Sequence, residues 1–264
     1  NEDSLAYSIV QNIDLDGDGV DAFRLEGNQL LVNDADDLNA DSTSPLAIAV
    51  EASDGLLSTS ASVTVSVTST EGVIFRIAAG DSDALDEALR NAQGGDIIEL
   101  AAGSTYLGDF KLSKKEGDGV IVIRTSAYAS LPEGRVSPED APLMAKLADR
   151  LGDSAIYTEE GASNYRIEGL EIVSLAETIG KLVNIGGGAR TAEAFSNNIT
   201  LDRCYVHGSP TQNIQRAILA NGSNITVSNS YISEIHKEGI ESQGFLAVLG
   251  TGPYTIENNF IEAA

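Results

Sequence analysis

Two different patterns of hydrophobic and polar residues divide the chain. In the first part, short runs alternate apolar and polar residues with a period of two, as in 61–67, where valines alternate with Thr and Ser. This period is typical of a half-buried strand. Strands are predicted at 5–10, 22–26, 29–32, 46–52 and 61–67. Small or acidic residues separate these runs, so residues 1–70 are predicted to form a β-sandwich module.

After residue 73 the apolar spacing predicts two helices among further strands. Residues 82–92 carry one apolar stripe with Ser82 or Asp83 as the N-cap, and Gly follows the last turn. A second helix is predicted from Ser137 to Leu151, because Pro138 would occupy its first position and an acid stands where a capping box needs one. The segments 96–100 and 119–124 are predicted strands.

A degenerate repeat is the most informative pattern. Its four rows are 165–172, 199–206, 225–232 and 254–261. One aligned column contains Ile167, Leu201, Val227 and Ile256, and another contains Ile172, Val206, Ile232 and Ile261. Strands this short bury an apolar face only if successive coils stack and share one interior. Because no helix fits between the rows, a parallel β-helix is favoured over a βαβ sheet, and Asn229 above Asn258 predicts an asparagine ladder in the turn.

The predicted fold class is therefore all-β. A sandwich module at 1–70 and a linker at 71–74 precede a parallel β-helix at 75–264. No closing coil is visible before Ala264, so we expect the β-helix to be incomplete at its C-terminus.

The composition of the chain excludes several classes of function. The 264 residues include 16 Lys and Arg against 40 Asp and Glu, which gives a formal net charge of −24. Such a field repels nucleic acids and anionic membrane surfaces. The single Cys excludes an internal disulfide, and no apolar run is long enough to span a membrane.

The first part of the chain resembles bacterial cadherin-like repeats. The resemblance rests on residues 5–9 and 21–25, and above all on 47–55 followed by 63–67. The first strand of such a repeat would lie upstream of Asn1, so we expect neighbouring modules in a longer parent chain. The family implies calcium binding and an extracellular or cell-surface location.

The second part resembles secreted right-handed β-helix proteins such as chondroitinase B and the alginate lyases. Residues 95–106 look like their opening coil, and 202–208 through 256–262 resemble uncharacterised bacterial members of the same fold. The resemblance covers about 75–264 and is specific for fold rather than activity. It implies that the β-helix is right-handed and that the helix near residue 82 is its N-terminal cap. It also implies a polysaccharide or cell-surface glycan as partner.

Alternating acids in residues 14–21 are candidate metal ligands. Asp14, Asp16, Asp18 and Asp21 could surround a hard cation, since calcium takes six to eight oxygens. The loop begins like an EF-hand, but its twelfth position is Leu25 and no flanking helices are predicted, so an EF-hand is rejected. The cadherin-like resemblance adds Asp54 and Asp41 as candidate calcium ligands. A solvated acidic turn is the alternative.

Catalytic candidates are few. Val173, His207, Ser233 and Glu262 each follow an apolar slot, so they are predicted to stack on one outer face. Uronate elimination needs a base and a cation that neutralises the carboxylate, for which the candidate basic residues are Arg216, His236, Lys237 and His207. Ordinary surface and turn roles are the alternative for all four residues. Cys204 fills a repeat position and is expected to be a packed thiol.

Two functions remain open. The first is a polysaccharide lyase-like enzyme with a glycan-contacting β-helix. The second is a non-catalytic adhesin or extracellular filament protein stiffened by calcium. The residues alone do not decide between these two functions.

Overall fold

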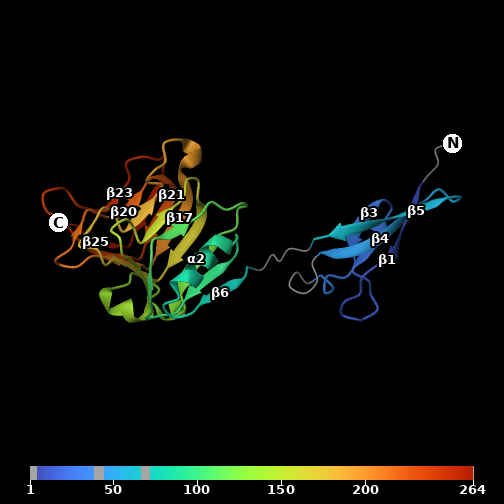
Figure 1. Cartoon of the computed structure of the whole chain (residues 1–264), viewed down its shortest axis with the longest axis horizontal. Coiled ribbons are helices and arrows are strands. Elements are labelled where there is room, and N and C mark those ends of the chain that lie inside the picture. The colour runs from blue at the N-terminus through green and yellow to red at the C-terminus, as the bar shows by residue number, and fades with distance from the viewer. Residues whose placement is uncertain (1–4, 39–44, 67–71, 264) are drawn as a thin grey trace. The chain divides into compact units, whose positions relative to one another are not determined.

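The computed structural model describes residues 5–38, 45–66 and 72–263. The chain divides into two compact units, Asn1–Thr70 and Glu71–Ala264 (Figure 1). The predicted linker 71–74 is too long, because Ile74 already begins a strand that pairs with its neighbour. No helix in the described ranges is both long and apolar enough to cross a membrane.

The first unit consists of two small antiparallel sheets that share a core. One sheet has the order β1-β4-β5 and the other is the hairpin β2-β3. The strands are β1(Ala6–Gln11), β2(Phe23–Glu26), β3(Gln29–Val32), β4(Leu46–Ser53) and β5(Ser58–Val65). Phe23, Leu46 and Ile48 are buried between the sheets. All five predicted strands are confirmed, with β5 beginning three residues earlier than expected.

The second unit is a parallel β-helix built from three long sheets. Sheet I has the order β24-β21-β17-β13-β10-β7-β6, sheet II is β25-β22-β18-β14-β11-β8, and sheet III is β23-β20-β16-β12-β9. Sheet I contains β6(Ile74–Ile77), β7(Ile97–Leu100), β10(Ile121–Thr125), β13(Ser163–Glu168), β17(Ser196–Asp202), β21(Gly222–Ser228) and β24(Tyr254–Glu257). Sheet II contains β8(Thr105–Leu107), β11(Ala145–Asp149), β14(Leu170–Ser174), β18(Tyr205–His207), β22(Tyr231–Ile235) and β25(Phe260–Ala263). Sheet III contains β9(Phe110–Leu112), β12(Ile156–Thr158), β16(Val183–Ile185), β20(Arg216–Ala220) and β23(Gln243–Leu246), and a further pair joins β15(Thr178–Ile179) to β19(Asn213–Ile214).

Strand pairing confirms the predicted repeat row by row. Ile167 pairs with Leu201, then Val227, then Ile256 along sheet I. The second column, which begins at Ile172, pairs in the same way along sheet II. Every one of these pairs is parallel, so the rows are consecutive coils of one β-helix.

The interior is apolar and is closed at one end by α2(Ser82–Asn91). Leu85 and Leu89 of this helix are buried and belong to the same core as the sheet interiors. Asp81, not Ser82 or Asp83, is the N-cap, and its carboxylate accepts a hydrogen bond from the Ala84 amide at 3.0 Å. Figure 1 shows α2 and β6 at the opposite end of this unit from β25.

The predicted helix at 137–151 is wrong. Its first half is the short 3₁₀ helix η2(Pro138–Leu143), which has the expected capping box between Ser137 and Asp140. Its second half is strand β11, whose Leu147 pairs with Tyr106 and Ile172 on the neighbouring coils. A helical period fits the apolar residues of 137–151, but a strand stacked between two coils places every second residue inward.

Residues 126–144, which we call the wall segment, pack against the outer face of sheet II. The segment also contains η1(Tyr128–Ser130). Its buried residues Leu131, Val136 and Met144 contact Tyr205 and Tyr231 of sheet II. The wall segment therefore covers part of this face and leaves the rest open.

The turn between sheets I and II has the same backbone conformation in four consecutive coils. Gly169, Arg203, Asn229 and Asn258 have φ values of 61°, 51°, 53° and 51°. The predicted ladder is confirmed, since Asn258 Nδ2 donates to Asn229 Oδ1 at 2.7 Å. Left-handed backbone is tolerated best by Gly and Asn, which explains why these residues mark the turns.

Candidate functional site

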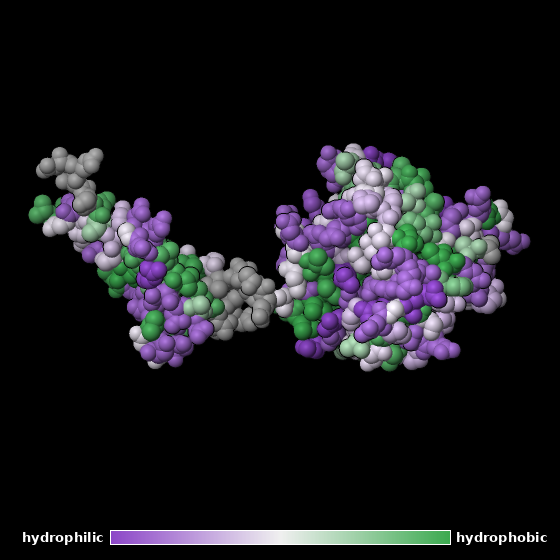
Figure 2. All heavy atoms as spheres, turned by 180° about the vertical axis from the view of Figure 1, so that it is seen from behind, coloured by the Kyte–Doolittle hydropathy of each residue, from purple (hydrophilic) through white to green (hydrophobic). Residues whose placement is uncertain are grey.

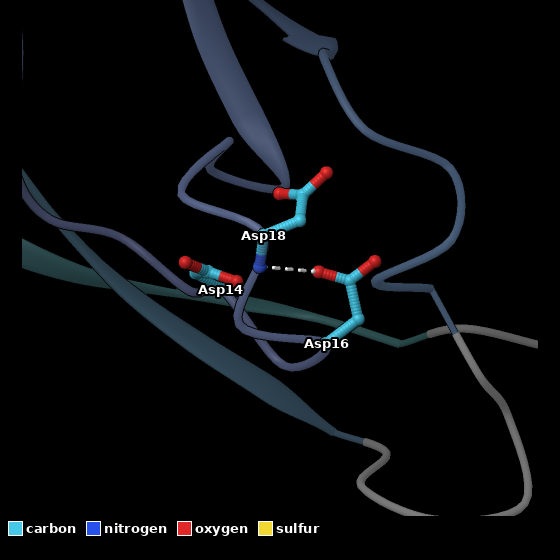
Figure 3. A group of neighbouring side chains, drawn as sticks. All are labelled: Asp14, Asp16 and Asp18. Carbon is cyan, nitrogen blue, oxygen red and sulfur yellow. Dashed lines mark hydrogen bonds between the residues drawn. The ribbon is translucent and has the colours of Figure 1, made fainter.

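Three carboxylates converge in the first unit, on the loop between β1 and β2. One oxygen each from Asp14, Asp16 and Asp18 lies within 4.8 Å of the others (Figure 3). The loop is held by its own side chains: Asp14 accepts from the amides of Gly17 and Gly19, and Asp16 accepts from the amide of Asp18. The loop leads directly into β2, in agreement with the rejection of an EF-hand.

A fourth carboxylate lies close to this loop. Asp37 is fully buried, and its Oδ1 accepts from the amides of Leu15 at 2.5 Å and Asp16 at 3.1 Å. Its Oδ2 is buried without a hydrogen-bond partner in the described residues. The hydrogen bond from the Asp18 amide lowers the pKa of Asp16, but desolvation and repulsion from Asp18, Asp37 and Asp34 outweigh it and raise that pKa. The loop thus concentrates negative charge that a cation would relieve.

The other sequence-predicted metal ligands lie apart from the three-carboxylate group. Asp21 is exposed and its backbone carbonyl accepts from Asn33. Asp54 caps the turn between β4 and β5, where the amides of Leu57 and Leu56 donate to its carboxylate and lower its pKa. Asp41 lies outside the described residues.

In the β-helix, a buried carboxylate joins two basic side chains on the outer face of sheet II. Glu171 Oε1 lies 2.9 Å from Lys146 Nζ and 2.9 Å from His207 Nε2. Burial would raise the pKa of Glu171, but the hydrogen bonds and charges of His207 and Lys146 outweigh burial and lower it. Glu171 is therefore ionised, and we call these three residues the sheet II cluster.

The imidazole of His207 is fixed on both sides. Its Nδ1 lies 2.7 Å from the Gly208 carbonyl and its Nε2 faces Glu171. Both contacts place a ring nitrogen against an acceptor oxygen, so two side chains with N–H donors meet at Glu171, those of His207 and Lys146. The ring also stacks on Tyr205, with centroids 3.9 Å apart and an interplanar angle of 16°.

Aromatic side chains continue from the cluster along sheet II. Tyr205, Tyr231 and Phe260 pair in register on successive strands. The Tyr231 and Phe260 rings stack with centroids 4.4 Å apart. Burial raises the pKa of Tyr205. The Tyr205 phenol is therefore a donor rather than a base at neutral pH.

A pocket of about 270 Å³ opens beside Lys146 and Glu171. Thr105 of β8 lines one side, and Pro142 and Met144 of the wall segment line the other. Figure 2 shows a largely hydrophilic face on this unit with apolar bands across it. The pocket, the cluster and the aromatic row together form a continuous outer site on sheet II.

The predicted outer column is partly assembled. His207 pairs with Ser233 on the next coil, but the ion-pair partner of His207 is Glu171, on the preceding coil, and not Glu262. Val173 and Ser233 are buried, with 8% and 6% of their surface exposed. The column is therefore not a uniform polar strip.

The remaining predicted catalytic residues lie elsewhere. His236 and Lys237 follow β22 and line a pocket of about 370 Å³ with Asn213 and Glu238. His236 Nε2 is 3.7 Å from Glu234 Oε2. Arg216 begins β20, where its guanidinium donates to the Gln215 side chain at 3.2 Å. Arg216 does not line the pocket formed by the other two.

Lys146 and Glu171 were not among the sequence-predicted site residues. Lys146 lies within 137–151, the segment that was wrongly predicted to be a helix. Glu171 could have been found, because the aligned rows place it in one column with Tyr205, Tyr231 and Phe260, directly before the inward-facing slot.

Comparisons with known proteins give little more. No protein-family profile matches the sequence, and no curated protein matches it. Among solved structures, an alginate lyase from Paenibacillus sp. str. FPU-7 is similar, with a TM-score of 0.42 and 17% sequence identity over 70% of this chain and 75% of that chain.

Proposed function

We propose that the β-helix unit binds an acidic polysaccharide along the outer face of sheet II and acts on it as a lyase. The observation that carries this proposal is the sheet II cluster. A buried Glu171 holds two basic groups side by side on a chain whose net charge is −24. A uronate carboxylate complements these basic groups, and the partly exposed ring of Phe260 at the end of the aromatic row offers an apolar face for a sugar ring.

The cluster suits the charge changes of β-elimination. In this reaction a base removes the proton beside the sugar carboxylate, the electron pair forms a carbon–carbon double bond, and the glycosidic oxygen leaves and takes up a proton. Lys146 and His207 would neutralise the carboxylate as its charge develops. The protonated phenol of Tyr205 would stand near the leaving oxygen as a donor. We assign the base to no residue.

The test measures unsaturated uronate by its ultraviolet absorbance after incubation with alginate, chondroitin or pectate. We expect product from at least one polymer, and its loss in Lys146→Ala and His207→Ala. Lys237→Ala, a basic residue outside the sheet II site, serves as the matched control. Binding without product would leave a non-catalytic glycan-binding protein. The absence of both binding and product would refute the proposal.

A second candidate function rests on the first unit. We propose that Asp14, Asp16 and Asp18 bind calcium and stiffen an extracellular spacer or adhesin. The unpartnered Oδ2 of the buried Asp37 supports this proposal, because its other oxygen already contacts the loop. Calorimetry should show one calcium binding event that Asp16→Ala and Asp18→Ala abolish and Asp54→Ala preserves. Calcium binding unchanged in Asp16→Ala would contradict the assignment.

A further inference from the structure

A second pocket of the β-helix has no part in the proposed lyase site. It measures about 300 Å³ and is lined by Asp109, Asp153, Ser154, Tyr157, Lys181 and Asn184. Asp109 lies between β8 and β9, and Tyr157 and Asn184 are paired on β12 and β16 of sheet III. The pocket therefore opens where sheet II turns into sheet III.

Asp109 lines the pocket and interacts with Asp149, which does not line it. Burial and then the contact with Asp149 raise the pKa of Asp109, whereas hydrogen bonds outweigh burial and lower the pKa of Asp149. Asp149 is fully buried and accepts from the amides of Leu151 and Gly152 and from the Ser174 hydroxyl. Three donors stabilise the ionised form of Asp149, so Asp109 holds the proton when the pair binds one. The wall of the pocket thus presents the Asp109 carboxyl group, which loses its proton as the pH rises through its pKa of about 6.

The other lining groups have unused hydrogen-bonding capacity. Across the described residues, neither the Lys181 ammonium, the Tyr157 hydroxyl nor the Asp153 carboxylate is in a hydrogen bond or ion pair. Asn184 has a buried Oδ1 without a partner. Donors and acceptors therefore line a space that takes roughly one sugar ring. The carboxyl groups of Asp109 and Asp153 against the single Lys181 ammonium disfavour a uronate, sulfate or phosphate.

We propose that this pocket binds one uncharged sugar unit through its hydroxyl groups, independently of the sheet II site. The Asp153 carboxylate and Asn184 Oδ1 accept from hydroxyls, and the Lys181 ammonium donates to ring or hydroxyl oxygens. Tyr157 presents its phenol beside them. This chemistry differs from that of the sheet II cluster, which favours a carboxylate.

Calorimetry and saturation-transfer NMR with methyl β-glucoside and N-acetylglucosamine test the pocket, with glucuronate as the anionic comparison. We expect at least one uncharged sugar to bind and glucuronate to bind more weakly. Lys181→Ala should weaken binding about tenfold, since it removes a charged hydrogen-bond donor. Lys111→Ala, which alters the residue beside Tyr157 on sheet III but does not line the pocket, should leave affinity unchanged.

Two further variants separate this proposal from the lyase proposal. Asp109→Asn keeps a donor toward Asp149 and should retain binding, while Lys146→Ala should retain binding whether or not lyase activity exists. Circular dichroism confirms that each variant is folded. The proposal is overturned if neither uncharged sugar binds, or if Lys181→Ala and Lys111→Ala bind equally well.

Discussion

Arg203 occupies a backbone position that suits Gly or Asn. Its φ of 51° is shared with Gly169, Asn229 and Asn258 in the same turn, and for a residue with a long side chain this conformation costs about 1 kcal/mol. The guanidinium makes three contacts that offset the cost. It pairs with Asp202 at 2.9 Å, lies 4.0 Å above the Tyr128 ring, and donates to the Pro132 carbonyl at 3.4 Å. Arg203 therefore fastens the wall segment to the turn.

Replacing Arg203 by Asn should separate these two effects. The backbone cost falls while the contacts to Tyr128 and Pro132 disappear, so we expect little change in Tm but faster amide hydrogen exchange in residues 126–136. Arg90→Asn, at the end of α2, is the matched control and should leave this exchange unchanged. Equal protection of the wall segment in both variants would show that Arg203 does not fasten it.

The Asp109–Asp149 pair makes stability depend on pH. Burial, then the contact with Asp149, raise the pKa of Asp109 to about 6 in the folded chain, above its unfolded value of roughly 3.9. Because the folded state binds this proton more tightly, its stabilising contribution is complete below the unfolded pKa and is lost as the pH rises through 6. Asp109→Asn should remove this loss. The check is the free energy of unfolding from urea titrations at pH 5 and pH 7.5, where an identical pH dependence in both proteins would contradict the assignment.

Among the elements, short strands were easier to predict from sequence than the segment 126–149. The predicted apolar columns through Ile167 and Ile172 are confirmed. Every coil must place an apolar residue inward, so an apolar residue recurs at the same position in each row of the repeat. Ser137 to Leu151 was misread because a capping box also fits a six-residue 3₁₀ helix, and only the neighbouring coils impose the strand at Leu147. Lys146, one of the three residues of the sheet II cluster, lies in that segment, so its position depends on the stacking of the coils.

Helix α2 is the element that closes the core, and Leu89 tests its contribution. Leu89 is 3% exposed and packs beside Leu85 against the sheet interiors. Leu89→Ala should lower the free energy of unfolding of the β-helix unit by about 2 to 5 kcal/mol, since it leaves a cavity. Leu151→Ala, at a residue that is 80% exposed, should change it by less than about 0.5 kcal/mol. Similar losses in both variants would mean that α2 does not seal the core.

At the scale of the whole molecule, charge separates the two units. Arg24 is the sole basic residue among residues 1–70, whereas the β-helix unit gathers basic side chains at local points such as Lys146 and His207. A net charge of −24 makes like-charge repulsion a general cost of folding. The pairing of two basic side chains on sheet II is therefore a specific local feature and not a reflection of overall composition.

Salt should reduce this repulsion. Because the screening length falls from about 30 Å at 0.01 M to about 10 Å at 0.1 M salt, we expect Tm to rise as NaCl is added over this range. Sucrose at the same osmolarity is the control for effects that do not depend on charge. A Tm that falls or stays constant in NaCl would show that attractive ion pairs outweigh the repulsion.

The interior position of Cys204 has a practical consequence. It is the single cysteine of the chain and has no exposed surface, and burial raises the pKa of its thiol to about 12. A thiol reagent can reach it only when the coil around β17 and β18 opens, since the thiolate is the reactive form. The rate at which a thiol reagent modifies Cys204 in the native protein therefore reports how often the β-helix opens. A second cysteine introduced at an exposed position could be labelled selectively without removing Cys204.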